Sequence, residues 1–136
     1  AGNPMACAVG REILDIIIEE NLCDNARRMG ARLVAGLRDL AGRHGIIGDV
    51  RGRGLLLAIE LVADRETRAP FPPSAGMNSR LTAAAAREGL IIYPRRPING
   101  LSGDHVLVAP PLIVTADQVD EILNRLDRAL AAAGGP

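Results

Sequence analysis

The stretch IIGDVRGRGLLLAIELV, residues 46–62, decides the fold of this chain. It predicts a short strand over Ile46–Arg51 and a stronger one over Gly54–Val62, because successive side chains there alternate between two faces with the period of a β-strand. Glycines flank Arg53, so a bend or a close backbone contact is expected at that point. Strands joined by so short a link should pair antiparallel.

Helices and two further strands are predicted on either side of this pair. The spacing of apolar residues predicts helices over Pro4–Glu20, about Asp24–Arg43, Met77–Gly89 and from a Thr115–Gln118 capping box onward, and strands over Leu90–Tyr93 and His105–Val108. Gly45 is expected to end the second helix in a left-handed conformation, and Ala131–Pro136 are expected to fray. The order of elements indicates an α/β (α+β) fold, a two-layer sandwich in which helices cover one face of a small, mostly antiparallel sheet.

The composition excludes several classes of protein. The 136 residues are 48% hydrophobic and 24% charged with no net charge, which fits one folded domain and gives no long-range field for nucleic acid or an anionic membrane. No apolar run approaches the roughly 20 residues that span a bilayer. Cys7 and Cys23 fit neither a disulfide framework nor a metal site, so they are expected to be buried free thiols in a reducing cytoplasm.

The basic residues are all of one kind. All 16 of them are arginine, so the sequence contains no lysine. Arginine stays protonated and cannot supply the neutral amine of a Schiff base, whereas lysine can. This chain alone therefore cannot carry out chemistry that depends on a lysine Schiff base.

Three short motifs follow one another along the chain. They are AGNPMACA at residues 1–8, GDVRGRGL at residues 48–55 with Glu60 after it, and GDHVLVAPPLI at residues 103–113. Together they resemble the GNPxACA, GDVRGRGLxxxxEL and GDHxxxAPPLI blocks of class III (omega-type) aminotransferases, which depend on pyridoxal phosphate. The resemblance covers essentially the whole chain.

The resemblance implies the C-terminal small domain of a fold-type I enzyme. Residues 1–136 would form that domain, with residues 1–20 as the helix that links it to a missing large domain. The Schiff-base lysine, the aspartate facing the pyridine nitrogen and the aromatic ring stacked on the cofactor would lie upstream. A threonine that donates to the cofactor phosphate, typically in the neighbouring subunit of a homodimer, would lie shortly before Gly2. A start at Ala1 fits a piece of a longer protein, although a removed initiator methionine also explains it.

The resemblance places the candidate substrate site after the third predicted strand. Several relatives carry a carboxylate-binding arginine at the position of Tyr93, and here Arg95 and Arg96 follow within a predicted eleven-residue loop, Pro94–Asp104. Either guanidinium could bind a substrate carboxylate in a two-pronged arrangement, or both could be solvated loop charges.

Gly2 and Asn3 are candidates for the cofactor phosphate of a partner subunit through backbone N–H groups, although a helix start also explains them. The remaining residues in the motifs have structural interpretations: Arg51 and Arg53 as strand-end charges paired with Asp49 or Glu60, His105 as a half-exposed sheet residue, and Pro110–Pro111 as a fixed turn. Ornithine-type relatives carry an arginine where this chain has Leu107, which favours an ω-amine or ω-amino acid donor with pyruvate as acceptor.

The sequence thus predicts an inactive C-terminal piece of a homo-oligomeric enzyme that transfers an amino group from an amine or ω-amino acid to a keto acid such as pyruvate. The alternatives are a non-enzymatic regulatory or interaction module, and a decarboxylase or racemase of the same cofactor family. Neither nucleic acid nor a membrane is an expected partner. The first predicted helix is apolar over more than one stripe, so an isolated copy should self-associate or cover this helix with another chain.

Overall fold

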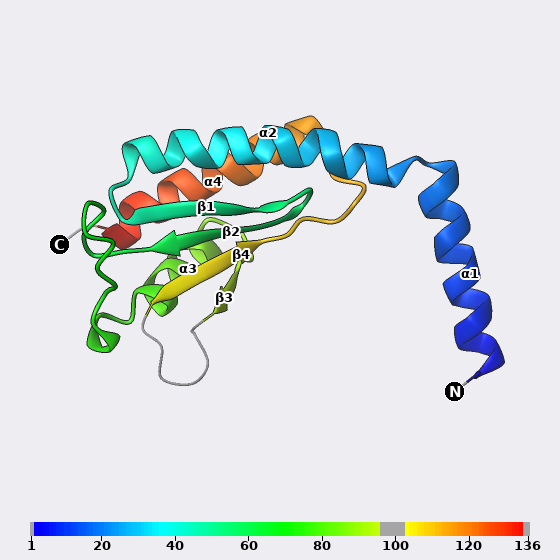
Figure 1. The fold of residues 1–136 in the computed structure, drawn as a ribbon, viewed down its shortest axis with the longest axis horizontal. Coiled ribbons are helices and arrows are strands. Elements are labelled where there is room, and N and C mark those ends of the chain that lie inside the picture. Colours follow the sequence, from blue (N-terminus) through cyan, green and yellow to red (C-terminus); the bar gives the residue numbers. More distant parts are fainter. Residues whose placement is uncertain (1, 96–102, 135–136) are drawn as a thin grey trace.

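A computed structural model describes residues 2–95 and 103–134 of the chain. The helices are α1 (Pro4–Glu19), α2 (Leu22–Arg43), α3 (Met77–Arg87) and α4 (Ala116–Gly134), the strands are β1 (Ile47–Arg53), β2 (Leu56–Leu61), β3 (Tyr93–Arg95) and β4 (Asp104–Val108), and η1 (Pro73–Ala75) is a short 3-10 helix. Figure 1 shows α2, α3 and α4 on one side of the sheet, while α1 projects away from both layers. The predicted order of elements and the two-layer sandwich are confirmed.

The sheet is antiparallel throughout, with the strand order β1-β2-β4-β3. The bend expected around Arg53 is the turn of the β1–β2 hairpin. Gly52 has a φ of +136° and Gly54 a φ of +56°, and a Cβ on Gly52 would lie 2.1 Å from the carbonyl oxygen of Leu56. Because β4 pairs between β2 and β3, the short strand β3 lies at one edge of the sheet.

The core lies between the sheet and the three helices that cover it. Four residues of β2 and β4 that face these helices are at most 1% exposed, namely Leu57, Ile59, Leu61 and Val106. The helices contribute equally buried side chains, Leu33, Leu37, Leu40, Leu81, Val119, Leu126 and Leu130. Burial of each such leucine stabilises the fold by about 1.5–3 kcal/mol. The opposite face of the sheet carries no helix among the described residues, and so it is available to the candidate site (Figure 1).

Helix α2 does not end in the predicted way. His44, in an extended conformation with φ −115°, ends the helix and donates its N–H to the carbonyl oxygen of Leu40. Gly45 is not among the described glycines with a positive φ. The N–H of Ile47 donates to the carbonyl oxygen of His44, so the chain turns directly into β1 without a left-handed residue.

Strand β3 begins three residues later than predicted. The N–H of Leu90 donates to the carbonyl oxygen of Ala85 at 2.8 Å, and Gly89 has a φ of +72°, so Leu90 still belongs to the cap of α3. Pro94 and Arg95, which were expected in a loop, therefore lie on the strand.

Helix α4 also differs from the prediction, because it continues to Gly134 without the expected fraying. Ala133 is only 2% exposed, so packing holds the last described turn of the helix. Residues 135–136 lie outside the described part of the chain. Cys7 and Cys23 are free thiols, but both are exposed, so the expectation that they are buried is wrong.

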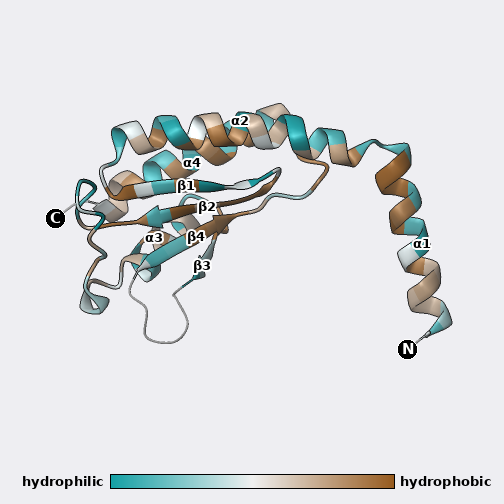
Figure 2. Ribbon diagram, in the orientation of Figure 1, coloured by the Kyte–Doolittle hydropathy of each residue, from teal (hydrophilic) through white to brown (hydrophobic). Residues whose placement is uncertain are grey.

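Helix α1 has no buried residue and packs mainly on the start of α2. Asn21, with φ 52°, makes the sharp change of direction between the two helices. The exposed apolar side chains of α1 are Met5, Val9, Ile13, Leu14, Ile16 and Ile18. Figure 2 shows these hydrophobic turns along a helix that the rest of the chain leaves uncovered. None of the described helices is long and apolar enough to cross a membrane.

Candidate functional site

The edge strand β3 carries two of the predicted substrate-binding residues on the open face of the sheet. Tyr93 pairs with Leu107 of β4 and Arg95 pairs with His105, so both side chains lie on the side opposite the core. The guanidinium carbon of Arg95 lies 5.7 Å from the centroid of the Tyr93 ring, within the range of a cation–π contact. Arg96, the third predicted residue, lies outside the described part of the chain.

A row of ionisable residues crosses all four strands on this face. The pairing of strands brings Asp49, Glu60, His105 and Arg95 side by side, one from each strand. His105 is half-buried within this row, which confirms its interpretation as a sheet residue. A cation and two acids thus lie on opposite sides of one histidine.

Arg51 belongs to the same face but is engaged by acids. Its Nη1 lies 2.9 Å from Asp49 Oδ2 and also donates to Glu60 Oε2. The hydrogen bond to Glu60, and then that to Asp49, raise the pKa of the Arg51 guanidinium above its ordinary value. The structural interpretation of Arg51 is therefore confirmed, and Arg95 is a cation on this face that rests on an aromatic ring instead of a carboxylate.

Helix α3 holds β3 from behind through a residue that the sequence did not single out. Asn78 is 3% exposed, and its Nδ2 donates to the carbonyl oxygen of Arg95 at 2.7 Å. Thr82 Oγ1 donates to the backbone carbonyl of Asn78, also at 2.7 Å. A polar residue next to an apolar helical stripe gives no local signal of such a contact, which only the packing of α3 on the sheet edge creates.

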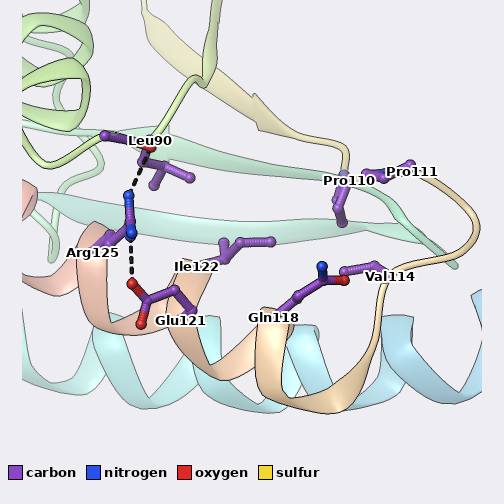
Figure 3. A pocket seen from close by; sticks show the side chains of 9 residues that line it. Leu90, Pro110, Pro111, Val114, Gln118, Glu121, Ile122 and Arg125 are labelled. Carbon is purple, nitrogen blue, oxygen red and sulfur yellow. Dashed lines mark hydrogen bonds and ion pairs between the residues drawn. The ribbon is translucent and has the colours of Figure 1, made fainter.

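An apolar groove of about 270 Å³ lies between α4 and the segments that lead into β3 and out of β4 (Figure 3). Leu90, Pro110 and Ile122 line it. Arg125 closes one end, where it donates to Glu121 and to the carbonyl oxygens of Glu88 and Gly89. These bonds engage Nε and Nη1 of Arg125, and Glu121 balances its charge, so the groove is a poor site for an anionic substrate.

The predicted turn into α4 follows Pro110, begins at Pro111 and has Leu112 and Ile113 as its central residues. The N–H of Val114 donates to the carbonyl oxygen of Pro111 at 3.0 Å, just before the capping box of α4. The box itself is confirmed, because the backbone N–H of Thr115 donates to Gln118 Oε1 and that of Gln118 to Thr115 Oγ1.

The other predicted site residues, Gly2 and Asn3, lie at the far end of α1, distant from β3 (Figure 1). Asn3 Oδ1 accepts a hydrogen bond from the N–H of Ala6 at 3.2 Å, and Pro4 has no N–H to donate. Gly2 is exposed with a φ of +97°, and a Cβ there would touch nothing within 4 Å. The chain therefore does not bring its candidate cofactor residues and its candidate substrate residues together.

Among the described residues, the groups expected for a pyridoxal phosphate site are not gathered in one place. The sequence has no lysine, and the first turn of α1 already uses one of its donors for the cap. Within the described ranges, no three His, Cys, Asp or Glu side chains lie close enough together to hold a metal ion. A cofactor that is bound through a lysine Schiff base would need a lysine from outside this chain.

Comparison with known proteins identifies the family. The model of the family described as "Aminotransferase class-III" matches residues 1–130 of this chain. The chain belongs to the class-III aminotransferases. The resemblance carried by the three motifs is thereby confirmed.

Individual class-III relatives match over most of this chain but over little of their own length. A taurine–pyruvate aminotransferase of Rhodobacter capsulatus is 45% identical over 123 residues, which are 90% of this chain and 26% of that protein. A probable gamma-aminobutyrate transaminase 3 of Oryza sativa is 33% identical over 132 residues, or 97% of this chain and 24% of that protein. The chain thus spans about a quarter of the length of these two relatives.

Solved aminotransferase structures agree with the fold. An amine transaminase from an uncultivated Pseudomonas species, solved with bound pyridoxal phosphate, matches with a TM-score of 0.86 and 39% identity over 98% of this chain and 28% of that one. A transaminase from the marine bacterium Virgibacillus matches with a TM-score of 0.90 and 34% identity, over 98% and 29% of the two chains. The small antiparallel sheet with helices on one face is therefore a segment of the fold-type I aminotransferase architecture.

Proposed function

We propose that residues 1–136 work as the C-terminal small domain of a longer, pyridoxal-phosphate-dependent aminotransferase. That enzyme would transfer an amino group from an amine or ω-amino acid to a keto acid such as pyruvate. The observation that carries the proposal is the 45% identity to a taurine–pyruvate aminotransferase, of which this lysine-free chain covers only 26%. A segment of that kind supplies one lobe of the enzyme and leaves the covalent chemistry to the remainder.

The division of labour follows from what the chain contains. Pyridoxal phosphate, when bound in the longer protein, would supply the electron sink of the reaction. The lysine that binds it would come from a large domain, since all basic residues here are arginine. This chain would shape one side of the substrate pocket and bind the carboxylate of the substrate.

Arg95 is proposed as the carboxylate anchor, with Tyr93 beside it and Arg96 as the alternative anchor. A guanidinium that rests on an exposed ring is held by only about 0.5–1 kcal/mol, so it can leave the ring for a carboxylate. A two-pronged bond to a carboxylate is a stronger, charge-assisted interaction. Arg51 is a poorer candidate because Asp49 and Glu60 already bind it.

The partner surfaces are proposed from exposure. The uncovered apolar side of α1 would pack on the large domain, with residues 1–20 as the link between the domains. Gly2 and Asn3, at the exposed start of this helix, would approach the cofactor phosphate of a second subunit in a homodimer. The free, exposed thiols of Cys7 and Cys23 favour a reducing cytoplasm.

The intact gene product tests the proposal directly. Added pyridoxal phosphate should give the absorbance band of a bound cofactor, and an amine with pyruvate should yield alanine. A protein that binds no cofactor would instead be a regulatory or interaction module. Cofactor binding with decarboxylation or racemisation, and no alanine, would assign a different reaction of the same cofactor family.

Substitution of the proposed anchor sharpens the test. Arg95→Leu should raise KM for pyruvate roughly ten- to hundredfold, the range expected from one charge-assisted hydrogen-bonded contact. Arg53→Leu is the matched control, because Arg53 is an exposed arginine at the opposite edge of the same sheet face. An unchanged KM in Arg95→Leu with an increase in Arg96→Leu would transfer the role to Arg96. Unchanged values in both variants would contradict an anchor in this segment.

A further inference from the structure

Asn78 is a buried polar residue beside the hydrophobic core of the sandwich. It lies on α3 at 3% exposure, next to Met77 and near Leu81, which are 2% and 0% exposed. Leucine has the same branching as asparagine and no polar atoms, so an apolar side chain would suit these neighbours better than an amide does. The amide must therefore serve its hydrogen bonds instead of the packing.

Only one end of this amide has a partner. Nδ2 donates to the carbonyl oxygen of Arg95 at 2.7 Å, while Oδ1 is buried without a hydrogen-bond partner in the described structure. A buried, unpaired carbonyl oxygen costs free energy. The fold contains the unpaired Oδ1 together with the hydrogen bond from Nδ2. This indicates that the role of Asn78 is to fix the backbone of Arg95.

The strand that Asn78 holds has few other restraints. In the described part of the chain, β3 has three residues, lies at the edge of the sheet and pairs only with β4. Its middle residue is Pro94, which has no N–H to contribute to the sheet. The bond from α3 therefore fixes the last residue of a weakly paired strand, and with it the direction in which the Arg95 side chain leaves the backbone.

We infer that Asn78 is a positioning residue, which aims the Arg95 guanidinium at a substrate carboxylate by holding the Arg95 carbonyl. This inference rests on the proposed function and deepens it, because it assigns the geometry of the carboxylate anchor to a residue of the helical layer. Asn78 does not touch the substrate. Its loss should weaken the binding of carboxylate-bearing acceptors and leave acceptors without a carboxylate unaffected.

The test uses the intact gene product with two amino acceptors, pyruvate and propanal, which differ in the presence of a carboxylate. Asn78→Leu removes both amide ends and keeps the branching of the side chain. It should raise KM for pyruvate about tenfold, with kcat for pyruvate and both constants for propanal within about twofold. Asn78→Asp, which keeps the size but replaces the donor with an acceptor, should give the same pattern and serves if the leucine variant does not fold.

Thr82→Val is the matched control, because it removes a 2.7 Å hydrogen bond to the backbone of Asn78 and leaves the Asn78–Arg95 bond in place. It should leave the ratio of the two KM values unchanged. A KM for pyruvate that is unchanged in the Asn78 variants, or raised equally for propanal, would overturn the positioning role while the aminotransferase activity stands. A wild-type protein that transfers no amino group to either acceptor would remove the proposed function and this inference together.

Discussion

Two arginines on one sheet face show how single partners decide the role of a residue. Arg51 donates to Asp49 and Glu60, so its charge is neutralised within the sheet. Arg95, at the opposite edge, rests on the ring of Tyr93 and keeps its charge available to an anion. Both residues are arginines, and they differ in their neighbours: Asp49 on the same strand and Glu60 on the paired strand lie beside Arg51. These two acids make Arg51 a structural cation and leave Arg95 as the candidate anchor.

At the residue scale, Asp127 predicts a dependence of stability on pH. Its hydrogen bond to His44, and then that to Arg43, hold the pKa of the Asp127 carboxyl below its ordinary value. A carboxyl with a lowered folded-state pKa stabilises the fold above its unfolded-state value of about 3.9, and this contribution is lost as pH falls through the folded-state pKa.

Asp127→Asn should therefore lower the free energy of unfolding by about 0.5–1 kcal/mol near pH 7, since a third of this side chain is exposed to screening solvent. The difference from wild type should shrink below about pH 4. Urea unfolding at pH 7, 5 and 3 measures it, with Asp39→Asn on the exposed side of α2 as the control. A difference that persists unchanged at pH 3 would contradict this origin.

At the scale of elements, the sequence predicts what local pattern determines. The hairpin of β1 and β2, the four helices and the Thr115–Gln118 cap all follow from periodicity, glycine and capping residues. The start of β3 does not follow from local pattern. Residues Leu90–Tyr93 have the apolar composition of a strand, but the hydrogen bond from the N–H of Leu90 to the carbonyl oxygen of Ala85 keeps Leu90 in the cap of α3. Pairing with β4 then determines that Tyr93–Arg95 form the strand, so tertiary contacts set its bounds.

The candidate site divides in the same way. Resemblance to a family points to Tyr93, Arg95 and Arg96, and strand alternation places the first two on one face once β3 is known. Neither shows that Asn78 holds the Arg95 carbonyl, because that bond joins residues 17 positions apart through the packing of a helix on a sheet edge. Hydrogen bonds of this kind have no signature in the sequence.

Packing of α2 on the hairpin gives a second prediction. A Cβ on Gly30 would lie 2.3 Å from the carbonyl oxygen of Gly54, and neither backbone can yield easily. Gly30→Ala should lower the free energy of unfolding by about 1–3 kcal/mol through overpacking. Gly42→Ala, on the same helix with nothing within 4 Å, should instead raise it by roughly 0.5–1 kcal/mol. Urea denaturation of both variants measures these two changes. A Gly30→Ala variant that is more stable than wild type would contradict the close approach of Gly30 to the Gly54 carbonyl.

At the scale of the whole molecule, the sandwich has a complete hydrophobic core, but nothing in the described chain covers the apolar side of α1. The three covering helices and the sheet bury their apolar residues against one another, whereas α1 contributes no buried residue. Helices that expose an apolar side in water mark surfaces that another chain or domain covers. The chain thus consists of a sandwich with its own core and one uncovered helix, α1.

The uncovered helix α1 makes the 136-residue chain prone to self-association. Leu14 and Ile18, at 60% and 74% exposure, lie one helical turn apart, and burial of each would contribute about 1.5–3 kcal/mol. Sedimentation at high concentration should show dimers or larger species for the wild-type chain. The double variant Leu14→Gln and Ile18→Gln should weaken this association at least about a hundredfold.

The double variant Arg11→Gln and Glu12→Gln makes the same number of changes on the same helix without removing apolar area, and it should associate like wild type. A wild-type chain that remains monomeric at high concentration would show that α1 folds back or unwinds to hide its apolar side. In the proposed longer protein the Leu14 and Ile18 changes should instead lower the stability of the contact between the two domains, because the large domain would already cover the same surface.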